Sequence, residues 1–190
     1  MKELSRELKS TLGGYDVTII KSAADTDGDY LLVQVVMGPK GGNGLHYHAT
    51  FEEEFEVLEG TLSIQLGKQR IQLQPGDKAV APKHVLHRFY NKDTCRKCVF
   101  LVTVKPARQF EATLRIAYGL AHDGLTRANG IPKSFWHTAL LFHMGESYTA
   151  GLPHRFQIWL AGLLAKEARR RGKHKDLEKY YLPQVAEQLA

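Results

Sequence analysis

Residues Gly41 to Gly60 read GGNGLHYHATFEEEFEVLEG, in which a His-x-His pair precedes a run of glutamates. Side chains two apart in an extended segment point to the same side, so the imidazoles of His46 and His48 share one face. Glu53 has the same parity as Phe55, whereas its neighbouring glutamates have the opposite parity. If the apolar side chains of this segment face the interior, Glu53 faces it with them.

A buried carboxylate needs a partner, because an uncompensated one in an apolar interior costs on the order of several kcal/mol. His87, on the same face of its expected strand as Phe89, points a third imidazole toward apolar neighbours. Imidazole suits Zn, Cu, Fe and Ni, a carboxylate adds affinity for Mn, and four protein ligands leave an octahedral ion two open positions. We therefore expect one divalent ion, Fe, Mn, Ni or Zn, bound by His46, His48, Glu53 and His87. The alternative is a metal-free barrel in which these residues are satisfied polar groups.

Short strands surround this stretch. Apolar residues at period two, bounded by turn residues, predict strands at 15–21, 30–37, 78–81, 87–90 and 97–105, and a hairpin that pairs 62–66 with 71–74. Many short antiparallel strands at this spacing are typical of a sandwich or a closed barrel. The sequence thus predicts a mainly β fold over residues 15–106, preceded by a polar lead, residues 1–14, with some helical character.

After Pro106 the apolar residues recur at helical spacing. We expect three helices: one soon after Pro106, one from Ser134 to Met144 with Ser134 as its N-cap, and one that opens at Pro153. The third has a single apolar stripe, made of Phe156, Trp159, Leu160, Leu163 and Leu164. This helical extension, residues 107–190, is expected to pack on the barrel or on a dimer partner.

Two motifs in the chain resemble those of the cupin superfamily. The first is written G-x5-H-x-H-x3,4-E-x6-G and matches through Gly60, except that Lys40 stands where the pattern opens with glycine. The second, G-x5-P-x-G-x2-H-x3-N, matches GDKAVAPKHVLHRFYN from Gly76 to Asn91, with His84 in place of the inner glycine. The resemblance covers residues 30–105 and implies an antiparallel cupin jelly-roll β-barrel, here followed by about three C-terminal α-helices.

His84 is the main departure from the second motif. Histidine tolerates the left-handed conformation better than most residues, so the turn can survive the substitution. It is also the only added titratable group close in sequence to the expected metal ligands, which makes it our candidate catalytic residue, as a general base. A residue of a surface turn is the alternative interpretation.

The composition is that of an ordinary globular chain, with 43% hydrophobic and 24% charged residues over 190 positions. It excludes a disordered, collagenous, coiled-coil or disulfide-stapled protein. No apolar run approaches the ~20 residues of a membrane-spanning helix, and the opening MKELSRELKS lacks the apolar segment of a signal peptide, so a cytoplasmic location is expected. Cys95 and Cys98 form a lone C-x-x-C, which is a weak signal for zinc binding or redox function.

The net charge of +6 is concentrated in the last part of the chain, where KEARRRGKHK spans Lys166 to Lys175. Such a run can mark a membrane-surface or nucleic-acid-binding helix. No aromatic residues interleave it as stacking platforms for bases would. We therefore expect a helix with a solvated basic end and no nucleic-acid partner. Binding of this helix to a membrane surface is the disfavoured alternative.

Two classes of function remain open. The first is a metal-dependent enzyme acting on a small molecule, in which the ion is a Lewis acid; the resemblance most often implies a dioxygenase and next an isomerase. The second is a noncatalytic module that binds or senses a small molecule and passes the signal through its helices. Fold cannot decide between them, since one superfold supports many functions. A homodimer is expected because such dimers are common.

Overall fold

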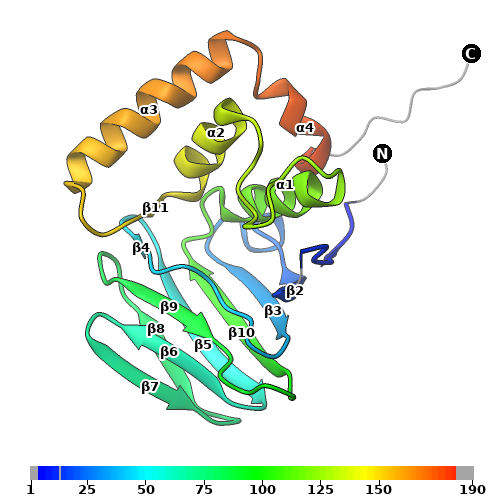
Figure 1. Cartoon of the computed structure of the whole chain (residues 1–190), viewed down its shortest axis with the longest axis vertical. Coiled ribbons are helices and arrows are strands. Elements are labelled where there is room, and N and C mark those ends of the chain that lie inside the picture. The colour runs from blue at the N-terminus through cyan, green and yellow to red at the C-terminus, as the bar shows by residue number, and fades with distance from the viewer. Residues whose placement is uncertain (1–3, 13, 183–190) are drawn as a thin grey trace, which may run out of the picture.

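A computed structural model of the chain describes residues 4–12 and 14–182. Its strands lie at one end and its helices at the other (Figure 1). The elements follow in the order β1 (Glu7–Leu8), β2 (Tyr15–Lys21), a 3-10 turn η1 (Ala24–Thr26), β3 (Leu31–Met37), β4 (Tyr47–His48), β5 (Glu52–Glu59), β6 (Leu62–Leu66), β7 (Gln69–Leu73), β8 (Lys78–Ala81), β9 (His87–Tyr90), β10 (Cys98–Lys105), α1 (Phe110–His122), α2 (Phe135–Gly145), β11 (Ser147–Tyr148), α3 (His154–Arg170) and α4 (Lys175–Tyr181).

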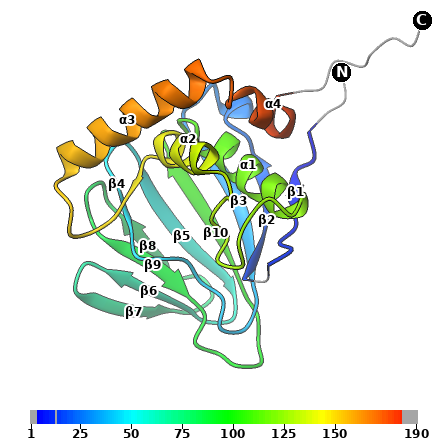
Figure 2. The same cartoon turned by 45° about the horizontal axis from the view of Figure 1, so that its top comes forward.

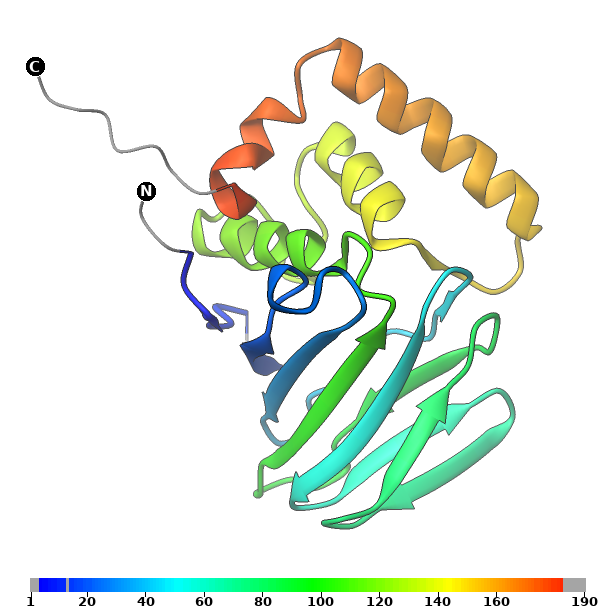
Figure 3. The same ribbon diagram turned by 180° about the vertical axis from the view of Figure 1, so that it is seen from behind.

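The strands form antiparallel sheets, as expected. One has six strands in the order β1-β2-β3-β10-β5-β8, a second has the order β7-β6-β9, and β4 pairs with β11 in a third (Figure 3). The prediction of a closed barrel is wrong, because the strands form separate sheets and not one continuous hydrogen-bonded ladder. The glycine-rich segment before β4 contacts β9 through two isolated bridges, Gly42 to Tyr90 and His46 to His87, instead of a continuous strand.

The core lies between the six-stranded and three-stranded sheets. Every second residue of β3 is buried, which is the pattern that its period-two sequence predicts. Phe55 of β5, Phe89 of β9 and Phe100 of β10 meet in the core with ring centroids 5.2 to 6.4 Å apart. Gly60 ends β5 at φ 78°, where a Cβ would lie 2.6 Å from the carbonyl oxygen of Lys97. The motif glycine is therefore required at this turn.

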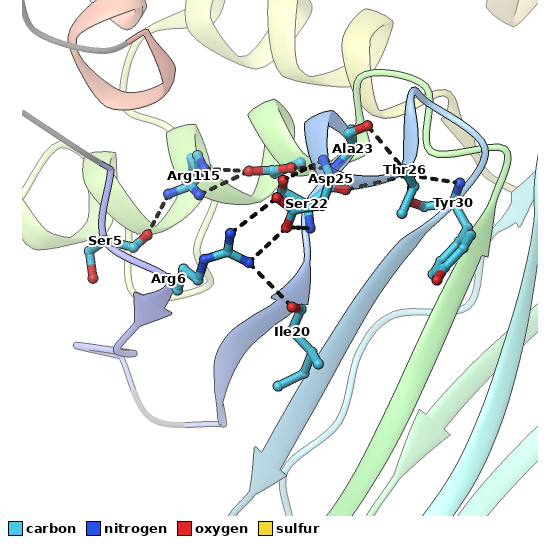
Figure 4. A network of polar contacts seen from close by, with 10 residues as sticks. Ser5, Arg6, Ile20, Ser22, Ala23, Asp25, Thr26, Tyr30 and Arg115 are labelled. Atoms are coloured by element: carbon cyan, nitrogen blue, oxygen red, sulfur yellow. Dashed lines mark hydrogen bonds and ion pairs between the residues drawn. The ribbon is translucent and has the colours of Figure 1, made fainter. Parts of the chain in front are cut away.

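The N-terminal lead is tied to the helical layer. Residues 4–12 contain β1 and no helix, so the helical character expected of the lead is wrong there; residues 1–3 and 13 lie outside the described residues. Arg6 forms an ion pair with Asp25 at 2.9 Å (Figure 4). The buried Arg115 of α1 donates to the carbonyl oxygen of Ser5 at 2.6 Å and to the carboxylate of Glu111 at 2.9 Å.

The helices cover the end of the β fold from which β4 and β5 carry the expected ligands (Figure 2). Ser134 caps α2 by accepting a hydrogen bond from the backbone N–H of His137, as expected. The described residues contain four α-helices rather than three. Gly172, at φ 72°, ends α3, and a separate helix α4 begins at Lys175, the last residue of the basic run.

The outward face of α3 differs from the expected packing. Its buried face is made of Gln157, Ala161, Ala165 and Ala168, which lie against α2 and its neighbours. Small residues permit this close approach, and the larger side chains lie on the outward face of the helix. Phe156, Trp159 and Leu163 of the expected packing stripe are therefore exposed, Trp159 by 60%. A dimer partner on this face stays a prediction.

Across residues 4–12 and 14–182, the helices are each too short or too polar to cross a bilayer.

Candidate metal centre

The expected ligands come from three neighbouring segments of the β fold. His46 and His48 lie at β4, Glu53 near the start of β5, and His87 at the start of β9. His48, Glu53 and His87 are buried, with exposed fractions of 1%, 4% and 1%. The parity argument for Glu53 is confirmed, because Glu52 and Glu54 on either side of it are only partly buried.

These four side chains converge. The Nε2 atoms of His46 and His48 lie 3.1 Å apart, and Nε2 of His87 lies 3.1 Å from Oε2 of Glu53. Nε2 of His48 is 3.7 Å from the other oxygen of Glu53. One ligand atom from each residue lies within 4.8 Å of all the others, and no other group of three or more His, Cys, Asp or Glu residues of this kind occurs among the described residues.

The outer ring nitrogens determine which face of each imidazole is free. Nδ1 of His46 donates to the carbonyl oxygen of Gly44 at 2.8 Å, and Nδ1 of His87 donates to that of Val85 at 2.9 Å. Nδ1 of His48 donates to the carbonyl oxygen of Glu146 at 3.2 Å. A neutral imidazole with its proton on Nδ1 presents a lone pair at Nε2.

Lone pairs that face one another across 3.1 Å, as at His46 and His48, repel unless a cation lies between them. The donor set therefore fits a divalent metal ion. Backbone carbonyls that hold the outer nitrogens are the usual support of metal-ligating histidines.

The protonation states of these side chains also fit metal binding. Burial lowers the pKa of His48 to about 4 and lowers the pKa of His46, so both imidazoles are neutral near pH 7. Burial opposes ionisation of Glu53, but the hydrogen bond from His87 and the nearby imidazoles outweigh it and lower the pKa of Glu53 to about 2. Burial likewise opposes protonation of His87, yet the bond to Glu53 raises the pKa of His87. Glu53 is thus the one carboxylate of the site, and it offers its negative charge to a cation.

The helical extension contributes to this site, which the sequence did not indicate. β11 pairs with β4, so that Ser147 is the register partner of His48. Glu146, the residue between α2 and β11, has a left-handed backbone at φ 45°. Its carboxylate accepts hydrogen bonds from Thr50 at 2.7 Å and from Arg108 at 3.2 Å. The ligand strand is thus attached to a segment about a hundred residues away.

A cavity of about 400 Å³ opens onto His46 and Glu53. Its walls include β-strand residues and residues of the extension: Tyr15, Val17, Val33, Val35, Asn43, Gly44, Leu45, Phe89, Val102, Phe110, Leu114, Phe142, Ser147 and Thr149. Buried Gln157 of α3 holds one part of the wall, because its amide bonds the backbone N–H and C=O of Thr149 at 3.0 and 2.9 Å.

His84 lies apart from the four ligands. It occupies the turn before β9 at φ 65°, so the left-handed geometry expected of this position is confirmed. Its side chain is exposed, and its ring lies 6.4 Å from that of Tyr47 and 5.5 Å from that of His154. The Tyr47 hydroxyl is 3.0 Å from Nδ1 of His154, on the side of β4 away from the metal ligands. A catalytic role for His84 stays a prediction.

Comparisons with known proteins agree with this fold and motif. Residues 33–104 match the family model described as the cupin domain. This match supports the cupin superfamily for this segment of the chain. A segment of 72 residues is 36% identical to quercetin 2,3-dioxygenase of Bacillus subtilis (strain 168), covering 37% of this chain and 21% of that enzyme. The chain thus spans about a fifth of the length of this relative.

Solved structures resemble part of the chain. KdgF from a Halomonas species is 22% identical with a TM-score of 0.44, over 50% of this chain and 81% of that one. An RmlC-like cupin from Shewanella frigidimarina is 18% identical with a TM-score of 0.46, over 57% of this chain and 94% of that one.

Proposed function

We propose that the chain is a metal-dependent cupin enzyme that acts on a small molecule. One divalent ion, Fe, Mn, Ni or Zn, is held by His46, His48, Glu53 and His87. The observation that carries this proposal is the convergence of three imidazole Nε2 atoms and one carboxylate within 4.8 Å, with every outer nitrogen bonded to a backbone carbonyl. Such a site, closed on its protein side and open to a cavity, is suited to binding a substrate.

The residues around the ion have separable tasks. His46 and His48 bind as neutral imidazoles, and Glu53 supplies the negative charge. A bound ion would supply Lewis-acid chemistry toward substrate oxygen atoms and, if it is iron, access to reactions of dioxygen. Mostly apolar walls surround the cavity beside the site. His84 is kept as the candidate general base.

The favoured reaction class is a dioxygenase-like one, and an isomerase-like one comes next. A segment that is similar to quercetin 2,3-dioxygenase supports the first of these classes, although the matched segment makes up about a fifth of that enzyme. A cytoplasmic homodimer is part of the same proposal.

The alternative is a noncatalytic module that binds or senses a small molecule. One observation favours it: the carbonyl oxygen of Glu146, at the end of α2, accepts a hydrogen bond from the proposed ligand His48. Binding at the site would therefore act directly on the contact between His48 and the end of α2, which is the coupling that a sensing module needs.

The decisive experiment is elemental analysis of the protein expressed without a histidine tag, beside His87→Ala and His122→Ala. His122 is an exposed histidine of α1 and serves as the matched control. We expect about one equivalent of metal in the parent and the control, and a loss in His87→Ala. Equally little metal in all three proteins after supplementation with Fe, Mn, Ni and Zn would overturn the metalloenzyme proposal. If metal is bound, oxygen uptake and isomerisation assays distinguish the enzyme from the binding module.

A further inference from the structure

The cavity above the candidate metal centre is charged at one end only. Glu53 and His46 lie at that end, and none of the described residues that line the cavity is Lys or Arg. The other walls are mostly Val, Leu and Phe side chains, which come from β2, β3, β10 and the extension among others. A molecule in this cavity therefore meets an ion-binding end and an apolar body.

This lining selects against phosphorylated and polyhydroxylated ligands. A phosphate placed away from the metal end would be buried with no cation to pair with it. An unpaired buried charge is strongly unfavourable, and each buried hydroxyl without a hydrogen-bond partner also costs free energy. A hydrocarbon ring, by contrast, gains free energy with each unit of apolar area that it buries.

Two polar side chains of the wall already take part in hydrogen bonds within the protein, so they offer few partners to a polyhydroxylated ligand. Asn43 already accepts a hydrogen bond from the backbone of Phe89, and Ser147 donates to the carbonyl oxygen of Gly145. Tyr15 also lines the cavity, and its hydroxyl is a further hydrogen-bond donor there. Burial, with the charge of Glu53 as a second cause, raises the pKa of Tyr15 to about 12, so that its proton is retained at neutral pH.

The roof of the cavity comes from outside the cupin-domain match. Phe110 and Leu114 of α1 and Phe142 of α2 lie beyond residues 33–104. A ligand that fills the cavity must touch these side chains, because they close one side of a space of about 400 Å³, toward the lower end of the range for ligand pockets. The extension thus determines the size and polarity of what can bind.

We propose that the ligand is a small, largely apolar ring compound that carries no phosphate, directs a pair of oxygen atoms at the four-residue centre, and packs its ring against the roof formed by Phe110, Leu114 and Phe142. Its oxygen contact rests on the proposed function. Its ring contact does not, since the walls are apolar whether or not an ion is present.

The test uses two probes and a phosphorylated comparator, each titrated calorimetrically into metal-free and metal-loaded full-length protein. Naphthalene-2,3-diol offers both a ring and an oxygen pair, 2-naphthol offers the ring with a single hydroxyl, and glucose 6-phosphate is the comparator. We expect the diol to bind the metal-loaded protein at least tenfold more tightly than the metal-free protein, and 2-naphthol to bind both forms alike. Glucose 6-phosphate is expected to bind at least a hundredfold more weakly than the diol.

Two variants of the roof locate the binding. Phe142→Lys places a cation in the cavity wall and is expected to weaken both naphthalene probes at least tenfold without changing metal content. Phe156→Lys alters the exposed outer face of α3 and is the matched control. Phe142→Ala, which is milder, should weaken 2-naphthol, and thermal melting verifies that each variant is folded.

The outcomes separate this proposal from the one on which it partly rests. Binding of 2-naphthol that depends on Phe142, in a protein that takes up no metal, would leave the ring proposal standing and overturn the metal proposal alone. Tighter binding of glucose 6-phosphate than of the diol, or unchanged affinity for both naphthalene probes in both folded Phe142 variants, would overturn the ligand class.

Discussion

Nδ1 of His48 donates a hydrogen bond to the backbone carbonyl of Glu146 at 3.2 Å, although the two residues are 98 positions apart in the chain. The imidazole proposed to bind metal is therefore oriented by the residue that ends α2. The Glu146 carboxylate is itself held by Thr50 and Arg108. An outer contact of this kind keeps the proton on Nδ1 and leaves Nε2 free.

Removal of the Glu146 side chain should weaken metal binding. Glu146→Gly keeps the left-handed backbone at low cost but loses the contacts to Thr50 and Arg108, so the carbonyl is less well fixed. We expect a loss of roughly 10- to 100-fold in metal affinity, measured by competition with a chromogenic chelator. Glu146→Gln retains hydrogen-bond acceptance and should bind nearly as the parent does. Parent-like affinity in the glycine variant would contradict the positioning role.

The metal-free protein should lose stability as the pH falls below about 6.5. The pKa of His48 falls from an ordinary 6.5 to about 4 on folding, because burial favours the neutral ring. The unfolded chain therefore binds more protons between these values, and the free energy of unfolding decreases as pH is lowered through them. Urea unfolding of chelator-treated protein at pH 7, 6, 5 and 4 measures this decrease. In His48→Gln the slope between pH 6.5 and 4 should be smaller; an identical slope would assign the effect to other groups.

His84 can be tested without disturbing the turn. Asparagine and glycine both accept the left-handed backbone seen at φ 65°, so His84→Asn and His84→Gly should fold. Metal content should be unchanged, since His84 is not one of the four converging residues. If His84 is the general base, turnover falls by roughly 10²- to 10⁴-fold in both variants. Parent-like turnover, once a substrate is identified, would leave His84 as a residue of the surface turn.

The two cysteines should differ sharply in reactivity. Burial raises the pKa of Cys98 to about 11, with the charge of Glu59 as a second cause, so its thiol stays protonated at pH 8. Cys95 is exposed, and both thiols are free. We expect a thiol reagent at pH 8 to modify Cys95 alone in the folded protein and both residues in denaturant. Rapid modification of both in native buffer would indicate that β10 opens locally.

The sequence predicted the β part of the fold well, for a physical reason. Period-two alternation determines which face of a strand is buried, so the strand at 15–21 and the buried position of Glu53 followed from parity alone. The pairing of β4 with β11 could not be predicted, because a two-residue strand has no period and its partner is about a hundred residues distant. For the same reason, the contribution of Glu146 to the site and of the helices to the cavity roof could not be predicted from the sequence.

The helical part was predicted less completely. The N-cap at Ser134 is a local signal and was found, whereas the break between α3 and α4 depends on one glycine within a basic run. The apolar stripe of α3, inferred from helical spacing, is only partly buried within this chain, and its packing on a dimer partner stays a prediction. In the structure, Ala161 and Ala165 face inward and Trp159 faces outward, so close helix packing outweighs the hydrophobicity of single residues.

The buried guanidinium of Arg115 couples two parts of the chain that are far apart in sequence. It bonds Ser5 beside β1 and Glu111 at the start of α1, and α1 carries part of the cavity roof. Loss of the Ser5 carbonyl would leave this buried guanidinium short of one acceptor, so detachment of the N-terminal segment and loosening of α1 are expected to be coupled in one cooperative opening. In hydrogen exchange, the backbone amides of β1 and α1 would then share a single protection level, and trimming the lead would change access to the cavity.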